Sequence, residues 1–341
     1  MIAQGKARMG WRAGKSSAIA IALSCLASMG LSSDGGPARQ ALPLAPVSTG
    51  TPYRAFSVRS EWNKTLPRRA PISAKSKHII GELKSFDSSI QYPKLAAGLW
   101  ADPVYFAHSG DPVYTIYPRD FGPTLSKVHI PLGARPADNS DGHMVVFDRI
   151  RGVVFELLHA AYDSTGRSWS ADGTALYSLS SNGLACTLPE SNRSCPMNSG
   201  HRGIPPAIHA VRYNEVRAGA IRHVLKISLD KTGECRVYPA SDYEDGQGGS
   251  ICEGTILRIK PGVDLRRRHL SYGCRVIAVA LKWYGAVVGD TGGVPMEIKL
   301  ENLQIEGRAQ RWSTLGVTAS CFRGKLSFND FVAIRLGYHR P

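Results

Sequence analysis

The residues best suited to chemistry cluster in one stretch, 138–163, which reads DNSDGHMVVFDRIRGVVFELLHAAYD. Its alternation of apolar and polar positions predicts two strands joined by a short turn at 149–152. His143 and Glu156 then lie on facing strands at unequal distances from the turn, so we predict a diagonal contact between their side chains. Asp141 precedes His143 by two residues. An Asp, a His and a Glu inside an apolar hairpin are typical of a site for proton transfer or ligand binding.

The candidate catalytic residues are His143, Glu156, His209, His223 and Tyr284. Glu156 lies among apolar neighbours, where an unpaired carboxylate is costly, so it needs a partner or a raised pKa. His209 follows the rigid GIPP loop, and His223 alternates with apolar residues in IRHVLKISL. A single histidine on a strand is more often structural than catalytic, so this interpretation requires that some of these residues converge on one cleft.

The candidate substrate-binding residues are Arg212, Asp141, Asp290 and Asn182. Asp290 belongs to GDTGG, which has Thr291 in place of the serine of a GDSGG protease motif. An aspartic protease needs two such aspartates, and the chain has a single DTG. A glycine-rich turn is therefore the favoured interpretation of this motif.

No metal or other cofactor is predicted, because the cysteines and histidines do not follow zinc-site spacing. One segment is rich in the oxygen ligands that calcium prefers. It contains Asp138, Asn139, Asp141 and Asp148. These side chains could hold a calcium ion, but their spacing lacks the EF-hand pattern, so a structural turn is favoured.

The N-terminus predicts export. Four basic residues precede an apolar run at 18–31, which is the layout of a secretory signal peptide, here assigned to 1–33. A spacer rich in Pro, Ala and Ser follows over 34–58. The predicted location is secreted or periplasmic, with a lipoprotein anchored through Cys25 as the alternative.

Apart from Cys25 in the signal peptide, the chain has six cysteines, which predict three disulfides, as expected for an exported chain. Six cysteines allow 15 pairings. The two short intervals favour bridges between Cys186 and Cys195 and between Cys235 and Cys252, which leaves Cys274 with Cys321.

Charge indicates the kind of partner. The net charge is +15, and residues 1–36 carry four basic residues and one acidic residue, so a chain without them keeps +12. An exported basic protein meets acidic polysaccharide or cell-wall polymer rather than nucleic acid. No stretch after the signal segment approaches the roughly 20 apolar residues of a membrane span, so no stable membrane insertion is expected. We expect a monomer.

Residues 59–341 predict a single, mostly β domain. Short β-rich segments such as PVYFAH, DPVYTIYP and TILRI are separated by Gly, Pro, Asp or Asn, as in a β-sandwich. One or two short helices accompany them. Apolar residues at helical spacing predict a helix over 274–284 that ends at Gly285, and 213–218 is long enough for one or two turns.

Linked short strings carry a resemblance to a known group of proteins. They are SDGHMVVFD, SNGL, GIPP, EVRAGAIRHVL, YPA, GTILRIKPGVDL and ALKWYGAVVGDTGG. Together they resemble, over 103–300, a group of exported bacterial proteins with jelly-roll or concanavalin-like sandwiches. The resemblance implies export and a sandwich fold, and it assigns no catalytic residue.

Three functions fit a basic, exported β-sandwich. A polysaccharide lyase needs a cation, a His or Tyr to take a proton and a Tyr to return one, which Arg212, the histidines and Tyr284 could supply. A glycoside hydrolase needs two carboxyl groups, for which Asp141, Glu156 and Asp290 are the best available. A non-catalytic carbohydrate-binding module needs only an aromatic platform and a polar rim. We expect a carbohydrate-active protein, with the binding module as the alternative.

Overall fold

The computed structural model describes residues 52–191, 200–245, 247–305 and 311–338. All of them belong to one compact unit, Leu44–Pro341. The predicted signal peptide and most of the predicted spacer lie outside the described residues. Within the described ranges the chain is mostly β, which confirms the predicted class, and its three α-helices are α1, α2 and α3.

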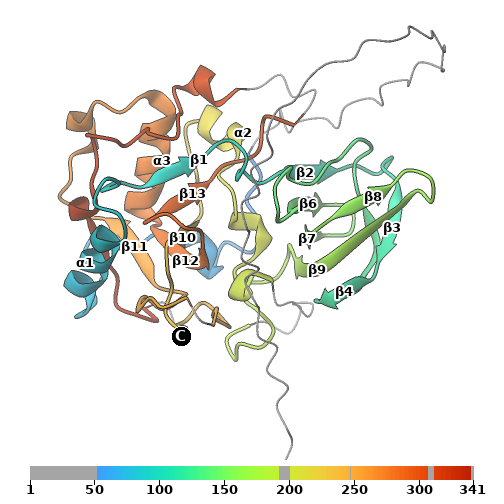
Figure 1. Cartoon of the computed structure of the whole chain (residues 1–341), viewed down its shortest axis with the longest axis horizontal. Helices are drawn as coiled ribbons and strands as arrows, with labels where there is room; N and C mark the ends of the chain where they lie inside the picture. Colours follow the sequence, from blue (N-terminus) through green and yellow to red (C-terminus); the bar gives the residue numbers. More distant parts are fainter. Residues whose placement is uncertain (1–51, 192–199, 246, 306–310, 339–341) are drawn as a thin grey trace, which may run out of the picture. The chain divides into compact units, whose positions relative to one another are not determined.

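One six-stranded sheet has the order β1-β13-β10-β12-β11-β14. Its strands are β1 (Lys94–Ala96), β10 (Leu225–Leu229), β11 (Ile256–Ile259), β12 (Ala286–Thr291), β13 (Glu297–Lys299) and β14 (Phe331–Ala333). The pairs β1/β13 and β10/β12 are parallel, whereas β10/β13, β11/β12 and β11/β14 are antiparallel. Helix α3 (Tyr272–Trp283) lies against β11 (Figure 1). Helix α1 (Ser76–Phe86) contacts β14.

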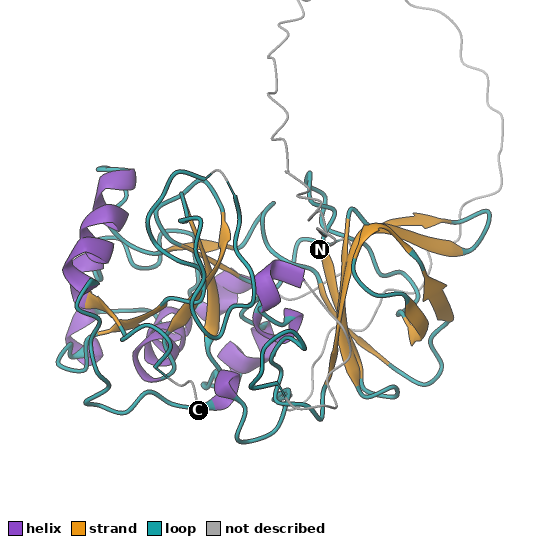
Figure 2. Cartoon of the chain, turned by 90° about the horizontal axis from the view of Figure 1, so that it is seen from below, coloured by secondary structure: helices purple, strands orange, loops and turns teal. Residues whose placement is uncertain are grey.

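The second large sheet has the order β2-β6-β7-β9-β4, with β8 paired to β9. Its strands are β2 (Val104–Ala107), β4 (Pro118–Phe121), β6 (Met144–Asp148), β7 (Val153–Leu158), β8 (Ala161–Asp163) and β9 (Ser168–Ser178). Strands β3 (Val113–Ile116) and β5 (Leu125–His129) form a separate pair. The helices gather beside the first sheet, whereas strands and loops make up the second (Figure 2).

The short helices connect these strands. Helix α2 covers Tyr213–Arg217, and the 3-10 helices are η1 (Glu61–Asn63), η2 (Gly200–Gly203), η3 (Pro206–Ile208), η4 (Leu265–Arg268), η5 (Trp312–Leu315) and η6 (Phe328–Asp330). Both predicted helices are confirmed, because α2 lies within 213–218 and α3 covers most of 274–284, whereas the 11-residue helix α1 was not predicted. Gly285, with φ +78°, follows the C-cap of α3 in the left-handed conformation that ends many helices.

The predicted hairpin is β6–β7. Every side chain of β6 is buried, because the strand lies between β2 and β7 with apolar residues on both faces. Val145 and Phe147 belong to a core that includes Ile256 and Val287 of the other sheet. This shared core packs one face of the hairpin against residues of β11 and β12.

Two of the predicted disulfides are present, Cys235–Cys252 and Cys274–Cys321. The third prediction involves Cys195, which lies outside the described residues. In the ranges that the structure covers, no helix combines the length and apolar character needed to cross a membrane.

Candidate functional site

The β6–β7 hairpin brings His143 and Glu156 together. Val145 lies directly opposite Glu156, so His143, two residues earlier on the same face, is the diagonal neighbour of the carboxylate. The Nε2 atom of His143 is 2.9 Å from Oε2 of Glu156. The predicted contact is confirmed, and both side chains are buried.

His209 approaches the same carboxylate from outside the hairpin. It is the C-cap of η3, directly after the short helix that the GIPP loop begins. Its Nδ1 atom lies 3.1 Å from Oε2 of Glu156, and its Nε2 atom lies 3.1 Å from the carbonyl oxygen of Ile204. One carboxylate oxygen therefore lies between two imidazole rings whose centroids are 5.7 Å apart. We call His143, Glu156 and His209 the His–Glu–His centre.

Asp102 lies behind His143. Its Oδ1 atom is 3.4 Å from Nδ1 of His143 and 3.4 Å from Nζ of Lys299. Asp102 is placed there because β2, which follows it, pairs in parallel with β6, and because Asp102 bridges to Glu301 after β13. The sequence did not predict Asp102 or Lys299, since neither belongs to a motif and both come from other strands.

Further charged groups surround the centre. Lys226 on β10 is buried and donates to Asp290 at 2.8 Å, so this predicted substrate-binding carboxylate is held in an ion pair. Thr291 N also donates to Asp290, as expected for a turn residue. Tyr177 on β9 is fully buried, and burial together with the charge of Glu156 raises the pKa of its hydroxyl well above the usual value. These positions were not predicted, apart from Asp290.

The two histidines of the centre have opposite pKa shifts. Burial lowers the pKa of His143, but Asp102 and Glu156 outweigh it and raise the value to about 9. Burial and the positive charge of Lys226 lower the pKa of His209, against the pull of Glu156. The pKa of Asp102 is held below its usual range although burial opposes this, because Lys299 and His143 stabilise the carboxylate.

Gly200 leaves room for the Glu156 side chain. A Cβ atom built on Gly200 would lie 1.9 Å from Oε1 of Glu156 and 2.5 Å from Cβ of Ala175. Real contacts are never that short, so no other residue fits at position 200 without moving the carboxylate. This glycine is required by close approach rather than by backbone conformation.

His223 and Arg212 belong to a different network. The Nε2 atom of His223 is 3.1 Å from Glu215, and its Nδ1 atom is 2.7 Å from the carbonyl oxygen of Val224. Arg212 pairs with Glu215 and donates to the carbonyl oxygen of Tyr53 at 2.7 Å. The structure does not bring these two predicted site residues into contact with the His–Glu–His centre. Their partners indicate a structural role.

The other predicted residues are spread around the fold. Tyr284 is the C-cap of α3 and packs against the apolar core. Asn182 accepts from Leu184 N and donates to the Glu190 carbonyl, which are turn contacts. Asp141 lies close enough to Lys299 that its charge contributes to the raised pKa of that lysine. Only Asp141 and Asp290 therefore remain near the centre.

The oxygen-rich segment 138–148 is used for local structure. Asn139 accepts from the backbone of Asp141 and donates to the carbonyl oxygen of Leu99. Asp148 is fully buried and accepts from His129 and from the backbone of Arg151. These contacts agree with the structural turn that the sequence favoured over a calcium site.

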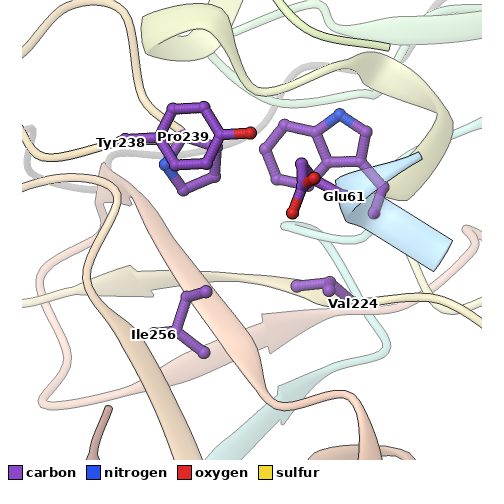
Figure 3. Close-up of a pocket in the computed structure, with 6 residues that line it drawn as sticks. Glu61, Val224, Tyr238, Pro239 and Ile256 are labelled. Carbon is purple, nitrogen blue, oxygen red and sulfur yellow. The ribbon is translucent and has the colours of Figure 1, made fainter. Parts of the chain in front are cut away.

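Two pockets lie elsewhere. Figure 3 shows one with a volume of about 10 Å³, lined by Glu61, Trp62, Val224, Tyr238, Pro239 and Ile256. It has room for about one water molecule. The other, of about 260 Å³, is lined by Lys75, His78, Ile79, Ser250, Ile251, Cys252, Thr255 and Leu336. Neither is lined by the His–Glu–His centre, whose side chains are only 1–4% exposed.

Among the described residues, His143, Glu156 and His209 are the group of three His, Cys, Asp or Glu side chains whose ligand atoms could surround one ion, all within 4.8 Å of one another. No family model, curated protein or solved structure matches the chain. The resemblance to exported sandwich proteins therefore stays a prediction, and function has to be argued from the centre itself.

Proposed function

We propose that the protein is an exported enzyme that cleaves an extracellular anionic polysaccharide, with the His–Glu–His centre as its active centre. The observation that carries this proposal is the convergence of His143 and His209 on one oxygen of Glu156, at 2.9 and 3.1 Å. Buried ionisable groups are costly unless they are paired, and such clusters concentrate at functional sites.

The arrangement favours a lyase over a hydrolase. A hydrolase needs two carboxyl groups with the scissile bond between them. The ring of His143 lies between the carboxylates of Asp102 and Glu156, since one of its nitrogens faces each. Asp290 is engaged by Lys226. Asp102, Glu156 and Asp290 are therefore each engaged by a basic side chain.

A lyase requires different groups, and the centre has them. In β-elimination a base takes the C5 proton of a uronate, the C4–C5 double bond forms, and the C4–O bond breaks as its oxygen gains a proton. A cation beside the uronate carboxylate stabilises the charge that develops. The centre has two imidazoles, the charge of Glu156 acts on the buried hydroxyl of Tyr177, and the lysines Lys226 and Lys299 lie nearby in ion pairs with Asp290 and Asp102.

Compartment and charge support the substrate class. The predicted signal peptide, the two disulfides and the charge of +12 without residues 1–36 fit an exported protein that acts on an acidic polymer. We also propose that the two large sheets form a sandwich of jelly-roll or concanavalin type, and that the protein acts as a monomer. Because the centre is almost fully buried, the polymer gains access only when surrounding segments move.

A screen of uronate-containing and neutral polysaccharides tests this proposal. The readouts are the ultraviolet absorbance of a new C4–C5 double bond and the release of reducing ends. We expect both signals with a uronate polymer. Reducing ends without absorbance would replace the lyase by a hydrolase. Retention on a polysaccharide column with neither signal would identify a binding module, and no response of any kind would contradict a carbohydrate function.

A further inference from the structure

We infer that the His–Glu–His centre binds one divalent transition-metal ion, through Nε2 of His143, the carboxylate of Glu156 and Nδ1 of His209. The inference deepens the proposed function, and it rests on that function for the role of the ion in catalysis. Binding of the ion itself is argued from geometry alone.

The two histidine rings are each held in a fixed direction by a contact outside the centre. The Nδ1 atom of His143 faces Asp102 at 3.4 Å, and the Nε2 atom of His209 faces the Ile204 carbonyl at 3.1 Å. A neutral imidazole has one N–H and one lone pair. When each N–H points to its outer acceptor, both lone pairs point at Glu156. In that arrangement the carboxylate oxygen and the two ring nitrogens offer lone pairs to one shared point, as the ligands of a metal ion do.

A single proton cannot form hydrogen bonds in both the His143–Glu156 and the His209–Glu156 contacts. A proton on Nε2 of His143 makes a hydrogen bond to Glu156, but the 3.1 Å approach of His209 Nδ1 to the same oxygen is left without one. A second proton would place two imidazolium rings side by side, with ring centroids 5.7 Å apart. A single divalent ion bonds to all three atoms at once.

The distances are close to those of a bound ion. Zinc lies about 2.0–2.1 Å from imidazole nitrogen and about 2.0–2.2 Å from carboxylate oxygen, so tetrahedral ligand atoms are about 3.3 Å apart. The two histidine–glutamate separations here are 2.9 and 3.1 Å. The three ligand atoms all lie within 4.8 Å of one another, so the two imidazole nitrogens would have to move closer together for all three atoms to bond one ion.

The outer contacts are those that metal sites use. A ligating histidine usually donates its other N–H to a carboxylate or a backbone carbonyl, which fixes the tautomer and the ring orientation. Asp102 and the Ile204 carbonyl are placed for these two roles. Two imidazoles and one carboxylate suit zinc and its neighbours in the first transition row, whereas calcium and magnesium prefer oxygen ligands throughout.

The ion would supply the cation that β-elimination needs. Beside the ion, the uronate carboxylate would be neutralised by the metal rather than by a lysine side chain, and the hydroxyl of Tyr177 rather than a ligating imidazole would transfer the protons. Lys226 and Lys299 are already engaged by Asp290 and Asp102.

The test measures metal binding to the full-length mature protein with disulfides intact. Chelator-treated protein is titrated with Zn²⁺ against a chromogenic chelator, and with Co²⁺ to record the visible spectrum of a four-coordinate ion. We expect one equivalent of each, and a rise in melting temperature with zinc. Glu156→Gln and His209→Gln should each weaken zinc binding by about 100-fold or more, since loss of an outer partner alone costs about 10–100-fold.

His223→Gln is the matched control, because His223 is also buried and bonded to a glutamate but lies outside the centre. Its zinc affinity should equal that of the native protein. Absence of stoichiometric binding by the folded native protein would overturn the inference, as would equal affinity in all three variants. Zinc binding without any polysaccharide cleavage would contradict the proposed function alone, and cleavage by metal-free protein would overturn the catalytic role of the ion.

Discussion

At the scale of single residues, Glu156 determines the properties of the centre. Its carboxylate is 4% exposed and lies on a strand with apolar neighbours on both sides. A buried carboxylate is tolerated only with partners, and two histidines provide them. Gly200 closes against the opposite oxygen, so the position of the carboxylate depends on the absence of a side chain at 200.

Gly200→Ala should therefore disturb the centre without removing any of its groups. The added methyl overlaps Oε1 of Glu156 and Cβ of Ala175, which should cost about 1–3 kcal/mol of stability and displace the carboxylate. We expect a lower melting temperature and reduced polysaccharide cleavage. Gly262→Ala is the control, because a Cβ atom there meets nothing within 4 Å. Equal behaviour of the two variants would show that Gly200 does not position Glu156.

The sequence predicted part of this residue-level arrangement. His143 and Glu156 could be paired because strand alternation and a short turn fix the register of a hairpin. His209 was a candidate, but its approach to Glu156 depends on how the GIPP loop lies over β7, which no local pattern encodes. Asp102 and Lys299 were missed because tertiary strand pairing brings them to His143.

At the scale of elements, α2 begins with a second buried network. Arg212 is the N-cap of α2, and Glu215 in its first turn bonds both Arg212 and His223. Burial alone would raise the pKa of Glu215, but Arg212 and His223 lower it to about 2. Because Arg212 precedes α2 and His223 precedes β10, this carboxylate connects the start of α2 to the segment before β10.

The pH dependence of unfolding should reveal this network. The folded pKa of Glu215, about 2, lies below the ordinary value of 4.5. The ionised Glu215 carboxylate therefore adds to the free energy of unfolding above pH 4.5, and this contribution is lost as the pH falls towards 2. Glu215→Gln should be less stable at neutral pH by about 3–5 kcal/mol, because Arg212 and His223 lose their carboxylate. Urea unfolding at several pH values should show that the difference in free energy of unfolding between the native protein and Glu215→Gln becomes smaller in acid.

Glu253→Gln provides a control of opposite sign. Burial raises the pKa of Glu253 to about 8, although Arg202 lies 3.6 Å away. The stability linked to this group is greatest below pH 4.5 and is lost as the pH rises through 8. The glutamine variant should accordingly gain stability over the native protein as the solution becomes alkaline. Parallel stability curves for both variants and the native protein would contradict these assignments.

Elements were more predictable than their pairing. The helices α2 and α3 and the β6–β7 hairpin follow from apolar periodicity, which acts over a few residues. The parallel pairing of β10 with β12 was not evident, because α3 and a long segment separate these strands. Residues far apart in sequence meet there through burial of a common core, and a single sequence carries little information on such contacts.

At the scale of the whole molecule, the described part of the chain contains two buried networks in which a glutamate bonds a histidine. In the first, Glu156 serves two histidines, and Asp102 lies behind one of them. In the second, Glu215 is balanced by Arg212 as well as His223. We assign catalysis to the first network and a structural role to the second.

The most direct test of this assignment is the cleavage rate of His209→Gln and His223→Gln on the polysaccharide that the screen identifies, measured below both melting temperatures. We predict that His209→Gln lowers kcat by about 100-fold or more, whereas His223→Gln stays within a few-fold of the native rate even if its melting temperature falls. Native activity in His209→Gln, or an equal loss in both folded variants, would contradict the claim that the His–Glu–His centre is the active centre.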